Sequence, residues 1–361
     1  MTRKRMLSFV VAVSALACAM AADSSAGIKA GAARRDITLA ELIGNPTVRD
    51  RLYARALVLN DGKNKVAIVG MDTCLPGAGW GYASGQEQFR GKTGGQCLGR
   101  IRKELGFEHV LINASHTHSD GRGGRKGTWS ERCEQLLFEV VKEADQNCTV
   151  PVSLHAGRAS VQIGGNRYGR AFTTAVVPWV NVLQARTKEG KTLTVLFEHA
   201  AHPVLTINGG GLSTDYPGHA IKRIKKELGA EAIPIFVQGC GGNINANPVG
   251  FSVRSGQHKN AERAGNKLGD AVLSAIRDSK QITADKLTLR SKTAMLGLRA
   301  PSRQEVDKRV AQFRKDNKGK PLPKELETLK GMIEAAEPPA QRFEINAVML
   351  GSQWLLVAMP G

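Results

Sequence analysis

The sequence predicts a single large α/β domain with mixed β-sheets flanked by helices and an active site at glycine-rich loops after strands. The first observation is that apolar runs of strand length alternate with longer segments whose apolar residues recur at helical spacing. The second is the composition, because 40 glycines with only 5% aromatic residues provide many tight turns. The third is the absence of repeats and low-complexity linkers over 361 residues, of which 42% are hydrophobic, enough for a sizeable core.

The N-terminal segment is predicted to be an export signal. Basic residues 3–5 precede an apolar run over 6–20, and Ala-Met-Ala at 19–21 is a plausible cleavage site. The run is short for a membrane span, and Cys18 lies in a poor lipoprotein box, so a retained anchor is disfavoured. We therefore expect residues 1–22 to be a signal peptide and the protein to be exported, periplasmic or extracellular, and soluble after cleavage.

The first half of the mature chain is predicted to be rich in strands. Residues 52–72 form a hairpin, because two β-rich runs flank an Asp-Gly turn. A helix containing residues 98–105 leads to a strand at 109–113, and apolar residues at helical spacing predict a second helix over 130–147. Residues 150–197 are predicted to form several strands.

The second half alternates helices and strands. We expect a helix at 216–228, a buried strand at 232–239, a helix across 258–278 and a strand pair near 285–297.

The C-terminal part begins with a charged helical segment at 302–337, which two prolines break near 320–323. We expect this segment to form a helical hairpin packed on the body, or a protruding arm. Two strands at 343–351 and 353–361 follow.

The formal net charge of +19 comes from Lys and Arg scattered over the chain. A nucleic-acid-binding protein would combine a basic stripe with stacking aromatics or a known module, and neither is present, so no nucleic acid is expected. Peripheral contact with an anionic membrane, or an acidic substrate, agrees better with this charge.

Five cysteines follow the predicted signal peptide, and their spacing matches no CxxC-type zinc site. An odd number in an exported protein allows at most two disulfides and one free thiol. Cys133 and Cys148 flank a predicted helix about 22 Å long, which would keep them apart. The pairing stays open.

Half of the eight histidines form two short clusters, each at the end of an apolar run. His116 and His118 are one residue apart after a strand, so both imidazoles can face one site. His199 and His202 form the second cluster. An isolated histidine is more often structural: His118 could cap a loop, and His199 could be a satisfied core residue or support a metal ligand.

Three glycine-rich corners follow strands, at residues 113–124, 199–218 and 239–248, and the first two carry the histidine clusters. Loops after strands converge at the carboxyl edge of an α/β sheet, where active sites gather. Zinc binds neutral imidazoles well, and a catalytic zinc activates a water molecule for attack on a carbonyl. Two histidine clusters on such corners therefore predict a metal site.

Six motifs occur here in the order found in one known family. They are LYARALVL, NASHTHSDG, GGNR at 164–167, AAHPV at 200–204, STDYPGHA at 213–220 and QGCGGNINANP at 238–248. The chain resembles the N-terminal catalytic domain of neutral/alkaline non-lysosomal ceramidases and their shorter bacterial relatives, and the resemblance covers residues 27–361.

The resemblance implies a set of site residues. The first histidine of HTH and the histidine of HP, here His116 and His202, bind the catalytic zinc. Arg167, in the family's NR motif, contributes to the active site, although a salt bridge that fixes a loop is an equal alternative. His118 is implied to be a supporting active-site residue. Asp215 could orient a zinc-bound histidine or the nearby backbone.

Two departures from the family pattern bear on the mechanism. Asn245 takes the position of a serine sometimes assigned as nucleophile, and an amide cannot serve that role. We therefore favour attack by zinc-activated water, with Asn245 orienting substrate or stabilising the oxyanion. The chain also stops at Gly361, where a zinc-binding glutamate would follow, and a tyrosine ligand would come further on. The resemblance thus implies a domain truncated at its C-terminal end, in which Asp215 or Asp120 could substitute as ligand.

The resulting prediction is an exported, zinc-dependent, ceramidase-like hydrolase. It would cleave an N-acyl amide bond, releasing a sphingoid base and a fatty acid from ceramide, or act on a related N-acyl or ester substrate. The alternative is a catalytically inactive ceramidase-like protein that binds anionic lipid or polysaccharide through its basic surface. A truncated chain that does not fold is the third interpretation. Oligomeric state does not follow from the sequence.

Overall fold

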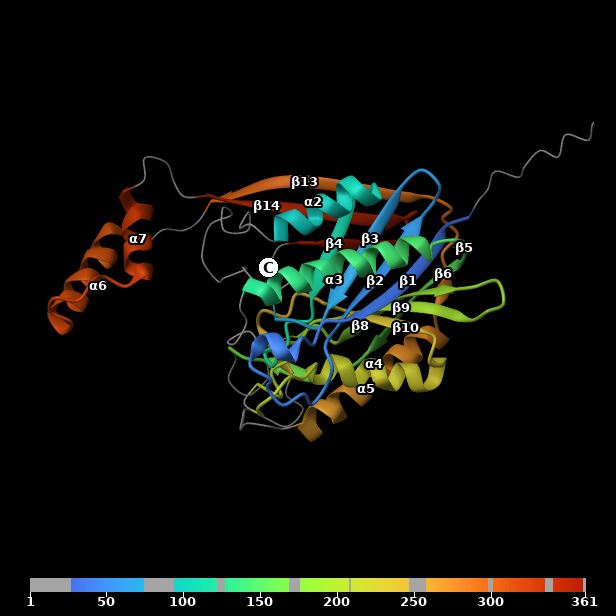
Figure 1. Ribbon diagram of the computed structural model, residues 1–361, viewed down its shortest axis with the longest axis horizontal. Coiled ribbons are helices and arrows are strands. Elements are labelled where there is room, and N and C mark those ends of the chain that lie inside the picture. The colour runs from blue at the N-terminus through green and yellow to red at the C-terminus, as the bar shows by residue number, and fades with distance from the viewer. Residues whose placement is uncertain are drawn as a thin grey trace, which may run out of the picture.

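In the computed structural model, two β-sheets pack face to face between two layers of helices (Figure 1). The structure describes residues 27–74, 94–121, 127–168, 176–207, 209–246, 258–297, 301–334 and 340–359. The predicted signal peptide lies outside these residues. Among the helices that are described, none has the length and apolar character needed to cross a membrane. The mixed α/β fold predicted from the sequence is confirmed.

The first sheet has the strand order β4-β3-β2-β1-β5. Its strands are β1 (Lys29–Asp36), β2 (Tyr53–Asn60), β3 (Lys65–Met71), β4 (His109–Ala114) and β5 (Val150–Pro151). The predicted hairpin is confirmed, because β2 and β3 pair antiparallel from Asn60 opposite Lys65. Strands β3 and β4 are parallel, with Met71 opposite Ala114. The loops that follow these two strands therefore leave the sheet side by side.

Two helices, α2 (Gly94–Leu105) and α3 (Gly127–Gln146), cover the outer face of this sheet, and the short 3₁₀ helix η1 (Ala40–Ile43) joins the same core. The position of strand β2 between two buried layers explains why its sequence is almost continuously apolar. Its residues Ala56 and Val58 pack toward the helices, whereas Leu57 and Leu59 face the second sheet. Successive side chains of a strand point to opposite faces, and here both faces are buried.

The second sheet has the order β10-β9-β8-β6-β12. Its strands are β6 (Ser153–Ser160), β8 (Trp179–Arg186), β9 (Thr192–His199), β10 (Ile233–Gln238) and β12 (Lys280–Gln281). Strands β9 and β10 are parallel, with His199 opposite Gln238. Helices α4 (Asp215–Leu228) and α5 (His258–Arg277) pack on the outer face, close to their predicted ranges. A separate two-stranded ribbon consists of β7 (Gly164–Asn166) and β11 (Ile244–Ala246).

The two sheets meet through aliphatic side chains. Leu57 and Ile68 of the first sheet share one buried cluster with Leu196 and Ile235 of the second. The two sheets approach closely at Gly70, because a Cβ at this position would collide with the backbone carbonyl of Phe236.

A third sheet extends this core with the order β13-β14-β15. Its strands are β13 (Leu287–Gly297), β14 (Ala340–Leu350) and β15 (Trp354–Ala358). The predicted strand pair near residues 285–297 is wrong, because β13 is one strand that pairs along its length with β14. Residues 287–296 contain no glycine, proline or asparagine that would form a turn, so the strand continues.

The predicted helical hairpin is confirmed as α6 (Arg303–Asp316) and α7 (Lys324–Glu334), which stand away from the body as an arm (Figure 1). Helix α6 begins with a capping box between Ser302 and Glu305.

In the part of the chain that the structure describes, no disulfide joins any of the five cysteines. Cys74, Cys97, Cys133 and Cys148 are buried, and Cys240 is exposed. The structure therefore forms neither of the two disulfides that the cysteine count allows.

Candidate metal centre

Loops that follow strands of both sheets meet at one edge of the molecule. Asn113, near the end of β4, joins the two sheets at this edge. Its Oδ1 accepts the backbone N–H of Gln238 at 2.7 Å, and its Nδ2 donates to the Gln238 carbonyl at 3.1 Å. One side chain thus fixes the carboxyl end of β4 against that of β10, the type of location where α/β active sites occur.

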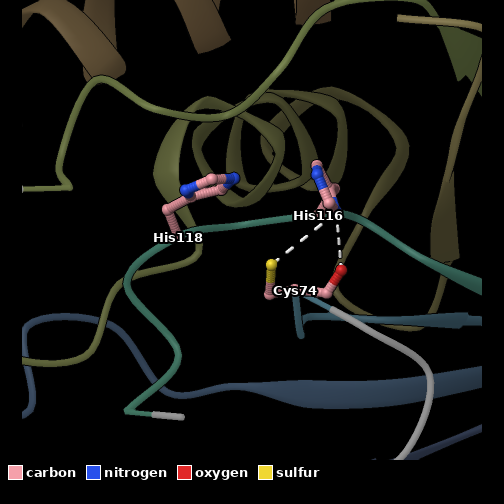
Figure 2. Close-up of side chains that lie close together, drawn as sticks. All are labelled: Cys74, His116 and His118. Carbon is pink, nitrogen blue, oxygen red and sulfur yellow. Dashed lines mark hydrogen bonds between the residues drawn. The ribbon is translucent and has the colours of Figure 1, made fainter. Parts of the chain in front are cut away.

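The pairing of β3 with β4 continues past the strands and places Cys74 beside His116. The backbone N–H of Ser115 donates to Met71 at 2.8 Å, and that of His116 donates to Thr73 at 2.9 Å. Nδ1 of His116 lies 2.6 Å from the carbonyl oxygen of Cys74 and 3.7 Å from its Sγ (Figure 2). His116 also has a φ of 67°, a left-handed conformation that is uncommon outside glycine and recurs at functional sites.

His202 is held in the loop after β9 by the ribbon strand β11. Its backbone N–H donates to Ile244 at 2.8 Å, and its carbonyl accepts from Ala246 at 3.0 Å. Nδ1 of the ring lies 2.7 Å from the Gly241 carbonyl. Because a neutral ring donates this Nδ1–H, the lone pair for a metal is on Nε2.

The three imidazoles predicted for the site come together. Ring centroids are 4.8 Å apart for His116 and His202, 5.1 Å for His116 and His118, and 6.0 Å for His118 and His202. Burial lowers the pKa of His202, and the neighbouring His116 and Arg167 lower it further. A lowered pKa keeps the imidazole neutral, the form that binds metal.

Asn245 lies on the ribbon strand β11 beside His202, and Arg167 directly follows the other ribbon strand, β7. The backbone N–H of Arg167 donates to Asn243 at 2.8 Å, and Asn245 forms a β-bridge with His202. Nη2 of Arg167 donates to the Tyr168 hydroxyl at 2.8 Å. Nε of Arg167 and Oδ1 of Asn245 are buried and have no hydrogen-bond partner among the described residues. One buried donor and one buried acceptor are thus present for a bound molecule.

Asp215 fixes the loop that follows His202. Its Oδ2 accepts the backbone N–H of Thr206 at 2.7 Å and the Thr206 hydroxyl at 2.9 Å, and its Oδ1 accepts the Tyr216 N–H at 2.7 Å. Ser119 Oγ lies 3.0 Å from the same Thr206 hydroxyl, which connects the two histidine loops. Burial raises the pKa of Asp215 to about 6.

Two further residues of the predicted set have contacts of a structural kind. Asp120 is buried, and its Oδ2 accepts the backbone N–H of Cys74 at 2.6 Å. His199, the last residue of β9, has Nδ1 2.8 Å from the carbonyl of Trp179 on β8, and burial lowers its pKa. The contacts of His199 are those of a satisfied core residue.

Sequence reasoning misses Cys74 as a member of this group. One ligand-type atom from each of Cys74, His116 and His118 lies within 4.8 Å of the other two, and the Cys74 side chain points toward the two rings (Figure 2). The sequence does contain a signal for Cys74. This residue lies three positions after the apolar strand β3, and His116 lies two positions after the strand β4. Only the parallel pairing of β3 with β4 makes these two positions neighbours.

The fold and the site together define an α/β protein with imidazoles and a thiol at the carboxyl ends of strands in two stacked sheets. Among solved structures, it is similar to the neutral ceramidase from Pseudomonas aeruginosa, with a TM-score of 0.64 and 15% sequence identity. That match covers 92% of this chain and 62% of the other. A ceramidase complexed with C2 matches with a TM-score of 0.63 and 15% identity, over 92% of this chain and 63% of the other.

The chain therefore spans a little under two thirds of the length of these structures and has a ceramidase-like fold. No family model and no curated protein sequence matches it.

Proposed function

We propose that the protein is an exported metal-dependent hydrolase that cleaves an N-acyl amide bond in ceramide or in a related N-acyl or ester compound. The observation that carries this proposal is the convergence of His116, His118 and His202 at strand ends of a ceramidase-like fold. Arg167 lies close enough to lower the pKa of His202. A metal-dependent hydrolase uses such elements, a group of metal-binding side chains and a cation that can stabilise the developing negative charge.

The residues present fit a zinc ion. Its proposed ligands include His116 and His202, the positions that the family resemblance implies, and His118 lies beside them. The carbonyl of Gly241 orients the His202 ring, as partners of metal-binding histidines usually do. When bound, zinc supplies a Lewis acid that polarises a carbonyl and lowers the pKa of a water molecule.

The unsatisfied atoms of Arg167 and Asn245 match the two polar atoms of an amide. Arg167 Nε can donate to the carbonyl oxygen and stabilise the negative charge that develops there. Asn245 Oδ1 can accept the amide N–H. An ester has no N–H, so it would leave this buried acceptor unpaired, and we therefore favour amide substrates over esters.

His118 is proposed to carry the proton. A ring nitrogen of the neutral imidazole can take a proton from the attacking water and return it to the leaving nitrogen. Its backbone N–H, 3.3 Å from the Pro203 carbonyl, ties its loop to that of His202.

The test is an assay of fatty-acid release from N-acyl sphingosine by zinc-loaded protein. His116→Ala and His202→Ala should each reduce the rate by at least about 100-fold. His155→Ala is the matched control, because this histidine contacts Ser153 on β6 and should leave the rate unchanged. Undiminished hydrolysis by both site variants, or after removal of the metal by a chelator, would contradict the proposal.

The same preparation tests the choice of substrate and the alternative function. Asn245→Ala should lower the rate on the amide more than the rate on the matching ester. A wild-type protein that binds anionic vesicles in a salt-dependent, chelator-independent way, and hydrolyses neither compound, would instead support a binding protein.

A further inference from the structure

Cys74 and His116 are arranged as two ligands of one metal ion. Tetrahedral zinc with Zn–S of about 2.3 Å and Zn–N of about 2.0–2.1 Å separates a sulfur from a nitrogen ligand by about 3.5 Å. Sγ of Cys74 lies 3.7 Å from Nδ1 of His116. A ring nitrogen of His118 completes a group whose atoms are all within 4.8 Å of one another.

The protein backbone holds this pair in place. The N–H of Cys74 donates to buried Asp120 at 2.6 Å, and the N–H of His116 donates to Thr73 at 2.9 Å. Cys74 is 1% exposed, so its sulfur faces the protein interior. A sulfur and an imidazole on fixed backbone suit zinc and cobalt, whereas magnesium and calcium prefer oxygen ligands.

We infer that Cys74 supplies a thiolate ligand to the metal at this site, beside the ligand His116. The inference rests on the proposed function only in that a metal binds here, and it adds a sulfur to the histidines that the family resemblance implies. On binding, the thiol proton is released to solvent. Nδ1 of His116 exchanges its hydrogen bond to the Cys74 carbonyl for the metal, and the neutral ring carries its proton on Nε2.

The test is spectroscopic and requires no turnover. Cobalt-substituted wild-type protein should show the near-ultraviolet thiolate-to-cobalt charge-transfer absorption. Cys74→Ser should abolish that band and weaken zinc binding by at least about 10-fold. Cys97→Ser is the matched control: burial, with the nearby Glu134, raises the pKa of the Cys97 thiol to about 12, so it stays protonated, and its variant should keep the band.

X-ray absorption of zinc-loaded wild-type protein makes the same test without a variant, in case Cys74→Ser fails to fold. A sulfur neighbour at the zinc is expected. A zinc spectrum with nitrogen and oxygen neighbours only, or a charge-transfer band that persists in folded Cys74→Ser, overturns the inference while leaving the hydrolase proposal in place. A wild-type protein that binds no metal overturns both.

Discussion

Arg55 and Asp72 form an ion pair in the interior of the protein. Nη1 of Arg55 lies 2.8 Å from Oδ2 of Asp72, with the side chains 8% and 3% exposed. The same oxygen accepts the backbone N–H of Tyr53 at 2.9 Å. Because Asp72 directly follows β3, the pair fixes the start of the short segment that carries Cys74. The candidate metal centre is therefore supported by a charge pair in the core of the first sheet.

We expect Arg55→Met to destabilise the protein by about 3–5 kcal/mol, because it leaves the Asp72 carboxylate buried without its partner. The double variant Arg55→Met/Asp72→Asn should lose less unfolding free energy than the two single variants lose in sum, since it removes both charges. Urea unfolding of the four proteins measures the coupling. Additive losses would show that the pair contributes no interaction energy.

Gly70→Ala should destabilise the protein by about 1–3 kcal/mol, because the added Cβ meets the Phe236 carbonyl and pushes the two sheets apart. Gly99→Ala is the matched control. This glycine is on helix α2, and beyond its chain neighbours and the backbone of its own helix nothing lies within 4 Å of the added Cβ, so alanine there should stabilise the protein by about 0.5–1 kcal/mol. Thermal unfolding measures both, and a Gly70→Ala protein as stable as wild type would refute the close approach.

Asn113→Ala should destabilise the protein by about 1–3 kcal/mol, because the part-buried N–H and carbonyl of Gln238 both lose the Asn113 side chain as partner. Asn113→Asp should change the contact with Gln238 in a different way at neutral pH. It keeps an acceptor for the Gln238 N–H but sets a carboxylate oxygen against the Gln238 carbonyl. We expect both variants to lower the urea midpoint and to reduce zinc affinity, since the histidine loops of the two sheets lose their link. Unchanged zinc affinity in both would mean that the loops are held by other contacts.

Asp215 should give the stability of the protein a pH dependence in the acid range. Burial raises its pKa from 3.8 to about 6 in the folded state, so the folded chain binds a proton that the unfolded chain releases between these values. The stabilising contribution is present below pH 3.8 and is lost as the pH rises to about 6, by up to about 1.4 kcal/mol per pH unit.

Asp215→Asn tests this assignment. The variant should be less stable than wild type at pH 4, because an amide N–H₂ replaces an oxygen that accepts two bonds from Thr206. The difference between the two proteins should shrink from pH 4 to pH 6 and then stay constant. A difference in unfolding free energy that does not change with pH would exclude the raised pKa.

The sequence determines most elements because local periodicity encodes them. The Asp-Gly turn and its β-rich flanks predict the hairpin of β2 and β3, and apolar residues at helical spacing predict α3 and α5. The predicted strand pair near residues 285–297 is wrong because β13 pairs with the distant strand β14. A partner far along the chain leaves no signal in the local sequence. The histidine motifs also indicate the site, because they end apolar runs at glycine-rich loops.

Only the tertiary structure decided which of these residues meet. His116 and His202 are neighbours because β3 pairs parallel with β4, β9 pairs parallel with β10, and the two sheets stack closely at Gly70. These are pairings between distant segments, and a sequence pattern fixes which face of a strand is buried but not which strand lies beside it. The same pairing brought Cys74 to the metal centre, where its spacing alone gave it no role.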